Sequence, residues 1–182
     1  MENNFSVEQF DFSDLDEELL ADKHCHQLLH RFYTWLQEEH GKDAAQASQL
    51  AYCVDYYLRD YLMDTLCRNV VRAKPGLIRC FGGTWYIIRN MEPDYEHLLQ
   101  HLQGIGFWYM FLHQLELITA DELATVKSET ADLNWFKERI NSFINNSLFK
   151  RYQQPSPTRF NSLFKRYQQT LCVFSNLYSL FK

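Results

Sequence analysis

The sequence predicts a mainly α-helical fold, a single-domain helical bundle of five or six helices around a central helix at about 92–117, with one short β-hairpin at about 77–88. Two observations predict this class. The 182 residues include only 6 glycines and 4 prolines, too few for the turns of a many-stranded β protein. Apolar residues also recur at steps of three and four in most segments, which is the spacing of one helix face.

The first predicted helix begins at about residue 13 and ends before Gly41. Ser13 and Asp16 resemble a capping box, and a glycine commonly follows the last turn of a helix. Five residues at helical spacing form its buried face: Cys25, Leu28, Leu29, Phe32 and Leu36. We expect the residues before it, 1–12, to be loose.

A second helix is predicted to run from Asp43, which can cap its N-terminus, to about Asn69. Two ion pairs are expected on it, each between residues four apart: Asp55 with Arg59 and Asp64 with Arg68. Residues 73–76, Ala-Lys-Pro-Gly, then predict a turn.

Residues 77–88, LIRCFGGTWYII, predict two short strands joined at Gly82 and Gly83. Two consecutive glycines accept the positive φ angles that a tight hairpin turn requires, and the flanking residues are rich in strand formers. A lone hairpin is only marginally stable in water. We therefore expect this one to pack on the helices or to pair with a second copy of the chain.

The central helix, at about 92–117, is predicted from its start signals and its apolar spacing. Pro93 stands near the first helical position, beside the acidic residues Asp94 and Glu96 that suit a helix N-terminus. Six residues form one apolar stripe: Tyr95, Leu98, Leu102, Ile105, Tyr109 and Leu112. Residues 107–112 are apolar on all sides and should be surrounded by protein. Two further helices are expected, at about 120–130 and from about 132.

We expect a helical core domain at 13–154, followed by a basic, aromatic C-terminal tail or helix at 155–182. The nonapeptide NSLFKRYQQ occurs twice, at 146–154 and at 161–169. Two copies are too few for a solenoid, which needs at least three stacked units. We interpret the repeat as a duplication tolerated at a permissive chain end, with a functional repeat as the alternative.

Charge is distributed unevenly along the chain. Residues 1–138 contain 11 basic and 23 acidic residues, whereas residues 139–182 contain 7 basic residues and no acidic one. The first part therefore has a net charge of −12 and the second +7. An asymmetry of this kind concerns partners or self-association rather than fold.

The basic tail supplies the candidate interaction residues, which combine cations with aromatic rings: Lys150, Arg151, Tyr152, Phe164, Lys165, Arg166 and Tyr167. Rings that stack on bases beside cations that contact phosphates are typical of single-strand nucleic-acid binding. The same residues also suit an amphipathic helix that docks on the acidic body of its own chain or of a second copy. A disordered tail is a third interpretation. We favour docking, because the acidic body would repel nucleic acid.

Two histidine pairs have the spacing of metal ligands. His26 and His30 are four residues apart, as are His97 and His101, so each pair lies on one helix face. Two such helices could supply four nitrogen ligands to a zinc ion. Neither pair includes the glutamate of the metalloprotease motif H-E-x-x-H. The alternative is that these histidines are solvated or lie at the edge of the core, and we expect no cofactor.

Asp60 and Asp64 are two carboxylates one helical turn apart, and a buried pair of this kind can act as acid and base. The structural interpretation is stronger, with Asp64 paired to Arg68 and Asp60 bonded to Arg59 or to a tyrosine hydroxyl. We therefore expect no catalytic activity.

Together these features predict a small, non-catalytic protein-interaction module that forms a homodimer or binds another protein. One alternative is a nucleic-acid-associated protein that uses the basic, aromatic tail. A second alternative is a metal-binding protein that uses the histidine pairs.

Overall fold

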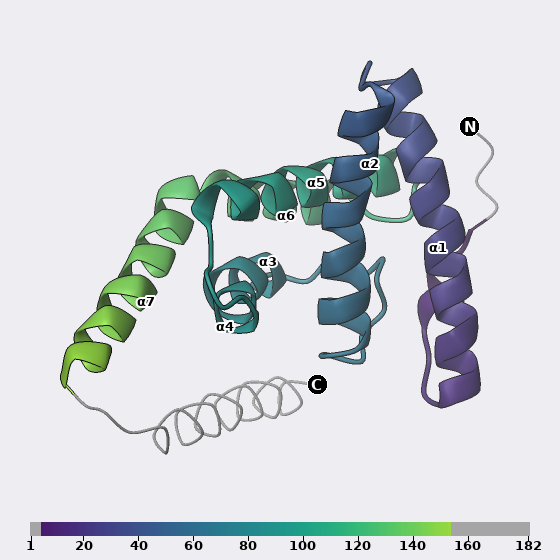
Figure 1. Ribbon diagram of the computed structural model, residues 1–182. Helices are drawn as coiled ribbons and strands as arrows, with labels where there is room; N and C mark the ends of the chain where they lie inside the picture. The colour runs from purple at the N-terminus through teal and green to yellow at the C-terminus, as the bar shows by residue number, and fades with distance from the viewer. Residues whose placement is uncertain (1–4, 154–182) are drawn as a thin grey trace. The chain divides into compact units, whose positions relative to one another are not determined.

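The computed structural model describes residues 5–153, with side chains up to residue 146, and this part of the chain is mainly helical and contains no strand (Figure 1). The elements follow in this order: η1 (Val7–Phe10), α1 (Leu15–Glu38), α2 (Ala44–Asp55), η2 (Tyr56–Met63), α3 (Leu77–Cys80), η3 (Phe81–Trp85), α4 (Tyr86–Arg89), α5 (Tyr95–Gln114), α6 (Ala120–Ala131) and α7 (Leu133–Gln153). The helical class predicted from the sequence is confirmed.

The chain divides into two compact units, residues 1–143 and 144–182. The first unit contains every element up to the first half of α7, and the core and the candidate site described below belong to it. The predicted tail at 155–182 lies outside the described residues.

Helices α1 and α2 lie side by side, and α2 also packs along α5 (Figure 1). The N-terminus of α1 is capped by Asp14, whose carboxylate accepts the N–H of Glu17. Ser13 takes part as well, because its N–H and hydroxyl both donate to the Glu17 carboxylate. Gly41, at φ +61°, follows the end of α1, and Asp43 caps α2 as predicted.

The second predicted helix changes character at Tyr56, where α2 continues into η2, a π-helical segment. Here the N–H of Asp64 bonds to the carbonyl of Arg59, five residues earlier instead of four. The helical turns end before Cys67, whose φ of 48° is unusual for a residue other than glycine. A π-helical hydrogen bond spans one residue more than an α-helical one, and such turns occur mostly as short insertions.

The predicted β-hairpin is wrong. Residues 77–89 form one continuous run of helix from α3 through η3 to α4, and Gly82 and Gly83 lie inside the π-helical η3. Neither glycine has a positive φ. A Cβ at Gly82 would approach the Phe136 ring to 2.7 Å, and one at Gly83 would overlap the Trp135 ring. The glycines are required for close packing against α7, and the left-handed turn is made earlier, by Gly76 at φ +86°.

Helix α5 begins after its cap Asp94, so Pro93 precedes the helix and is not its first residue. It packs against α1, α2 and α6. Trp108 and Phe111 are fully buried, as the apolar surroundings of this segment predict. The Trp108 ring meets the Phe32 ring of α1 edge to face at 5.4 Å, so α5 and α1 share one aromatic cluster.

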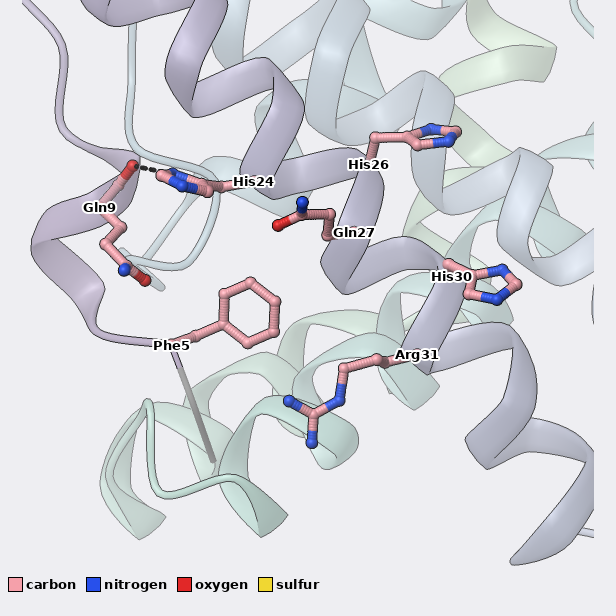
Figure 2. Close-up of a pocket in the computed structure, with 7 residues that line it drawn as sticks. All are labelled: Phe5, Gln9, His24, His26, Gln27, His30 and Arg31. Carbon is pink, nitrogen blue, oxygen red and sulfur yellow. Dashed lines mark hydrogen bonds between the residues drawn. The ribbon is translucent and has the colours of Figure 1, made fainter. Parts of the chain in front are cut away.

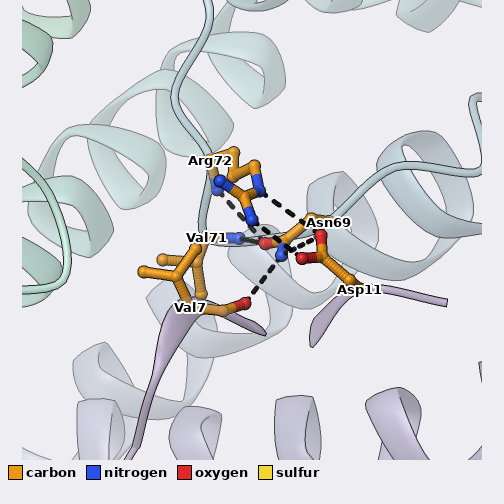
Figure 3. Close-up of polar contacts among 5 residues, drawn as sticks. All are labelled: Val7, Asp11, Asn69, Val71 and Arg72. Atoms are coloured by element: carbon orange, nitrogen blue, oxygen red, sulfur yellow. Dashed lines mark hydrogen bonds and ion pairs between the residues drawn. The ribbon is translucent and has the colours of Figure 1, made fainter. Parts of the chain in front are cut away.

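Within the segment predicted to be loose, Val7 and Asp11 are hydrogen-bonded to Asn69 (Figure 3). The Asn69 amide donates to the carbonyl of Val7 and to Asp11, both at 2.8 Å. Its oxygen accepts the N–H groups of Val71 and Arg72. The Arg72 guanidinium lies 2.8 Å from the Asp11 carboxylate, and this hydrogen bond, together with that from Asn69, lowers the pKa of Asp11. The network joins η1 to the chain that follows η2.

Candidate functional site

The candidate site lies on the side of α1 that is turned away from the core. An α-helix turns by about 100° per residue, so Leu15, Leu19, His26 and His30 lie within about 60° of one another around the helix axis. We call these four residues the α1 stripe. All four are exposed, whereas a second flank, centred about 120° away around the helix axis, is buried: Ala21, Cys25, Leu28, Leu29, Phe32 and Leu36.

The N-terminal end of the α1 stripe is apolar. Leu15 is 68% exposed and Leu19 is 62% exposed, and the neighbouring Leu20 is 53% exposed. A single exposed leucine is ordinary, but Leu15 and Leu19 lie one turn apart on the same face and form a patch of the kind found at contact surfaces. Four acidic residues adjoin the patch along the chain: Asp14, Asp16, Glu17 and Glu18.

The other end of the α1 stripe consists of two imidazoles. Figure 2 shows His26 and His30 projecting from the same side of α1, one turn apart. Neither ring makes a hydrogen bond, ion pair or ring contact with another described residue. His24, on the same helix, differs from them because its Nδ1 lies 3.1 Å from the Gln9 carbonyl oxygen, to which it donates. Both nitrogens of His26 and of His30 are therefore available to a ligand.

A shallow depression of about 530 Å³ adjoins the histidines (Figure 2). It is lined by Phe5, Gln9, His24, His26, Gln27, His30 and Arg31. The Arg31 guanidinium covers the Phe5 ring at 5.4 Å, a cation–π contact between α1 and the N-terminal segment. The described residues that line the depression do not include a nucleophile held by a base.

The second predicted histidine pair lies in a different environment. His101 is buried, and its Nδ1 lies 3.0 Å from the Cys53 carbonyl oxygen, so this nitrogen carries the hydrogen. Its Nε2 is buried without a partner among the described residues. Burial lowers the pKa of His101 to about 4, so the ring is neutral at pH 7. His97 is exposed, its Nδ1 lies 3.2 Å from the Tyr86 hydroxyl, and its ring centroid is 4.8 Å from that of His101.

The four predicted metal ligands are not brought together. Among the described residues, no group of three or more His, Cys, Asp or Glu side chains is arranged to hold a metal ion. His26 and His30 remain a two-ligand pair on the surface of α1, and His97 and His101 belong to the packing of α5 against Cys53 and Tyr86.

The predicted ion pair of Asp55 with Arg59 is present at 2.6 Å, and Arg59 also reaches Asp22 of α1 at 3.2 Å. The pair of Asp64 with Arg68 is not among the ion pairs of the described residues. Burial and the neighbouring Asp64 raise the pKa of Asp60, but no hydrogen bond joins the two carboxylates in the described structure. The geometry therefore does not support Asp60 and Asp64 as an acid–base pair.

A second, smaller cavity of about 150 Å³ lies between α6, the turn before α3 and the buried Tyr57 and Tyr109. The hydroxyls of these tyrosines are 3.4 Å apart. Glu129, also buried, accepts the N–H groups of Gly76 and Arg79 and so caps α3. Sequence reasoning missed this role of Glu129, because no local pattern connects a residue of α6 with a turn fifty residues earlier.

Of the predicted interaction residues of the C-terminal region, three lie within the described part of the chain and four do not. Lys150, Arg151 and Tyr152 lie in the second half of α7, where the side chains are not described. Phe164, Lys165, Arg166 and Tyr167 lie outside the described residues. These residues stay predictions.

Comparisons with protein-family models, with curated proteins and with solved structures found no match to this chain. In the described part of the chain, no helix combines the length and the apolar character that crossing a membrane requires. The interpretation of the α1 stripe therefore depends on its own geometry.

Proposed function

We propose that this protein is a small, non-catalytic interaction module that forms a homodimer through the α1 stripe. The observation that carries the proposal is the exposure of Leu15 and Leu19 on a regular helix whose other flank is buried. Apolar side chains that a helix holds in water, although it has a core to pack against, are typical of a surface covered by a partner.

A second copy is a suitable partner because the stripe runs along one face of α1 and can pack against the same stripe of another chain. In a parallel pairing about a two-fold axis, each residue faces its own counterpart, so apolar atoms meet apolar atoms. Leu15 and Leu19 would then lie on the partner's Leu15 and Leu19. Two identical helices commonly associate in this way when apolar residues follow one face.

The leucines alone support only a weak dimer. Burying a leucine contributes about 1.5–3 kcal/mol, so four leucines contribute at most about 12 kcal/mol, whereas association costs about 4–15 kcal/mol. The rest of the stripe must therefore contribute if the dimer is to persist at low concentration.

The proposal is tested by the mass of the full chain in solution, measured by sedimentation equilibrium over a range of concentrations. We expect the parent to be dimeric at high concentration and the variant with Leu15→Glu and Leu19→Glu to be monomeric, because the new carboxylates would face each other. Met91→Glu is the matched control, since Met91 is an exposed apolar residue that is not part of α1. A parent that is monomeric throughout, or a double variant that dimerises like the parent, would rule out this interface.

A further inference from the structure

We infer that His26 and His30 form one half of a divalent transition-metal site and that a second copy of the chain supplies the other half. This inference rests on the proposed homodimer and states what holds it together. The ligand class is an ion that prefers imidazole nitrogen, such as Zn²⁺, Ni²⁺ or Cu²⁺, rather than Mg²⁺ or Ca²⁺, which prefer oxygen.

His26 and His30 have the spacing of a metal-binding pair. His26 and His30 lie well inside the 24-residue α1, one turn and about 6 Å apart along the axis. This is the spacing at which a helix presents two imidazoles to one zinc ion. Figure 2 shows both rings on the same side of the helix, directed outward.

The rings of both histidines are accessible to an ion. A histidine that is already engaged by the protein has less capacity to bind a metal, and His24 and His101 are engaged through their Nδ1 atoms. His26 and His30 are both exposed, and their rings have no partner among the described residues. An ion can therefore reach them without any movement of the fold.

One chain supplies only part of the ligand set that a zinc ion needs. Zinc in proteins is almost always bound by four ligands in a tetrahedron, and the described residues gather no group of three. Two positions on the ion are thus left open on one chain. In a parallel pairing of the α1 stripe, the partner's His26 and His30 face the same point, and a two-fold axis through the ion gives four nitrogen ligands.

The experiment uses the full chain, first freed of metal with a chelator and then titrated with Zn²⁺. Binding is followed by calorimetry, and mass is followed by sedimentation velocity at the same points. We expect binding to saturate at one zinc per two chains, with the mass doubling at the same ratio. The variant with His26→Gln and His30→Gln should lose both responses, while keeping the circular dichroism spectrum of the parent because both side chains are exposed.

His24→Gln is the matched control on the same helix, and His97→Gln is the control on α5; both should bind zinc and dimerise like the parent. The single change His26→Gln should weaken zinc binding by more than the roughly 10–100-fold loss that is typical of a lost outer-shell partner. Equal zinc binding by the double histidine variant would overturn the site.

Other outcomes separate this inference from the proposed function. Saturation at one zinc per chain without a change of mass would overturn the bridged arrangement. A dimer that survives chelation and both histidine changes, but not Leu15→Glu with Leu19→Glu, would leave the proposed interface standing and overturn the metal site. A chain that neither binds zinc nor dimerises under any condition would refute both.

Discussion

Trp135 occupies the space that a side chain at Gly83 would need. Its ring lies so close to the Gly83 Cα that even a methyl group there would overlap it. The contact is reinforced from the same helix by Arg139, whose Nε donates to the Gly83 carbonyl oxygen at 3.2 Å. The first part of α7 is therefore fitted to η3, and glycine at position 83 is a packing requirement.

Substitution of Gly83 should accordingly destabilise the fold. We expect Gly83→Val to lower the free energy of unfolding by about 1–3 kcal/mol, because overpacking forces Trp135 to move. Gly106→Ala is a matched control within a helix, since a Cβ there meets nothing within 4 Å. That change should stabilise the protein by about 0.5–1 kcal/mol, the usual gain of alanine over glycine in a helix. Urea unfolding measures both, and equal effects of the two changes would contradict the packing argument.

Trp108 should be among the most costly residues to truncate. It is fully buried between α5 and α1, and its indole N–H has no partner among the described residues, so packing accounts for its contribution. We expect Trp108→Ala to cost about 3–5 kcal/mol, the range for large aromatic residues in cores. Tyr52→Ala removes a comparable ring that is 63% exposed and should change stability by less than about 0.5 kcal/mol. Similar melting of the two variants would refute the burial argument.

Asn69 should be sensitive to a change of one atom. Asn69→Asp keeps the oxygen that accepts the N–H groups of Val71 and Arg72, but it loses the amide hydrogens donated to Val7 and Asp11. It also places a second carboxylate beside Asp11. We expect a loss of about 1–3 kcal/mol at pH 7, and a smaller loss at a pH low enough to protonate carboxylates.

The measurement is urea unfolding of the Asn69→Asp variant at the two pH values, with Asn134→Asp at an exposed position of α7 as the control. A loss that does not change with pH would show that repulsion from Asp11 is not the cause. Amide hydrogen exchange of η1 gives a second readout, because the N-terminal segment should open first.

His101 should make the stability of the fold depend on pH. Burial lowers its pKa to about 4, whereas a histidine in an unfolded chain has a pKa of about 6.5. Between these values the unfolded chain binds a proton that the folded chain does not. Stability should therefore fall as the pH falls from about 6.5 to about 4, and this contribution should level off below that range, after a total of about 3 kcal/mol.

The variant His101→Gln tests this dependence, because it keeps a donor for the Cys53 carbonyl and removes the titration. Its unfolding free energy should change less with pH than that of the parent, by about the same 3 kcal/mol. Gln103→Ala, at an exposed position of the same helix, should follow the parent. Parallel pH profiles for the parent and His101→Gln would contradict the assignment.

Much of the helical structure could be predicted because its signals are local. Asp43 and Thr119 cap α2 and α6 with their own side chains, and Gly41 ends α1 in the left-handed conformation. The segment 77–88 was beyond such reasoning. Its apolar and aromatic residues suit a strand as well as a buried helix, and the choice between them depends on Trp135 and Phe136, which reach Gly82 and Gly83 from a distant part of the chain.

Half of the candidate site could be predicted from the sequence. The spacing of His26 and His30 is visible in the sequence, and the structure places both on the surface. Leu15 and Leu19 were not predicted as site residues, because the acidic residues around them indicate only the start of a helix. The signal was present in their phase, since they do not fall on the face formed by Cys25 and Phe32. Their exposure, however, depends on what the rest of the fold covers.

The segments η2 and η3 lie against each other, and in both the backbone hydrogen bonds reach five residues back. The extra residue in the turn lets Phe81, Trp85 and Tyr86 all point inward, although they are four and five positions apart. Inserting or deleting one residue here would rotate everything beyond it by about 100° and would turn these rings out of the core. At this point of the molecule the length of the chain is constrained as strictly as the identity of its side chains.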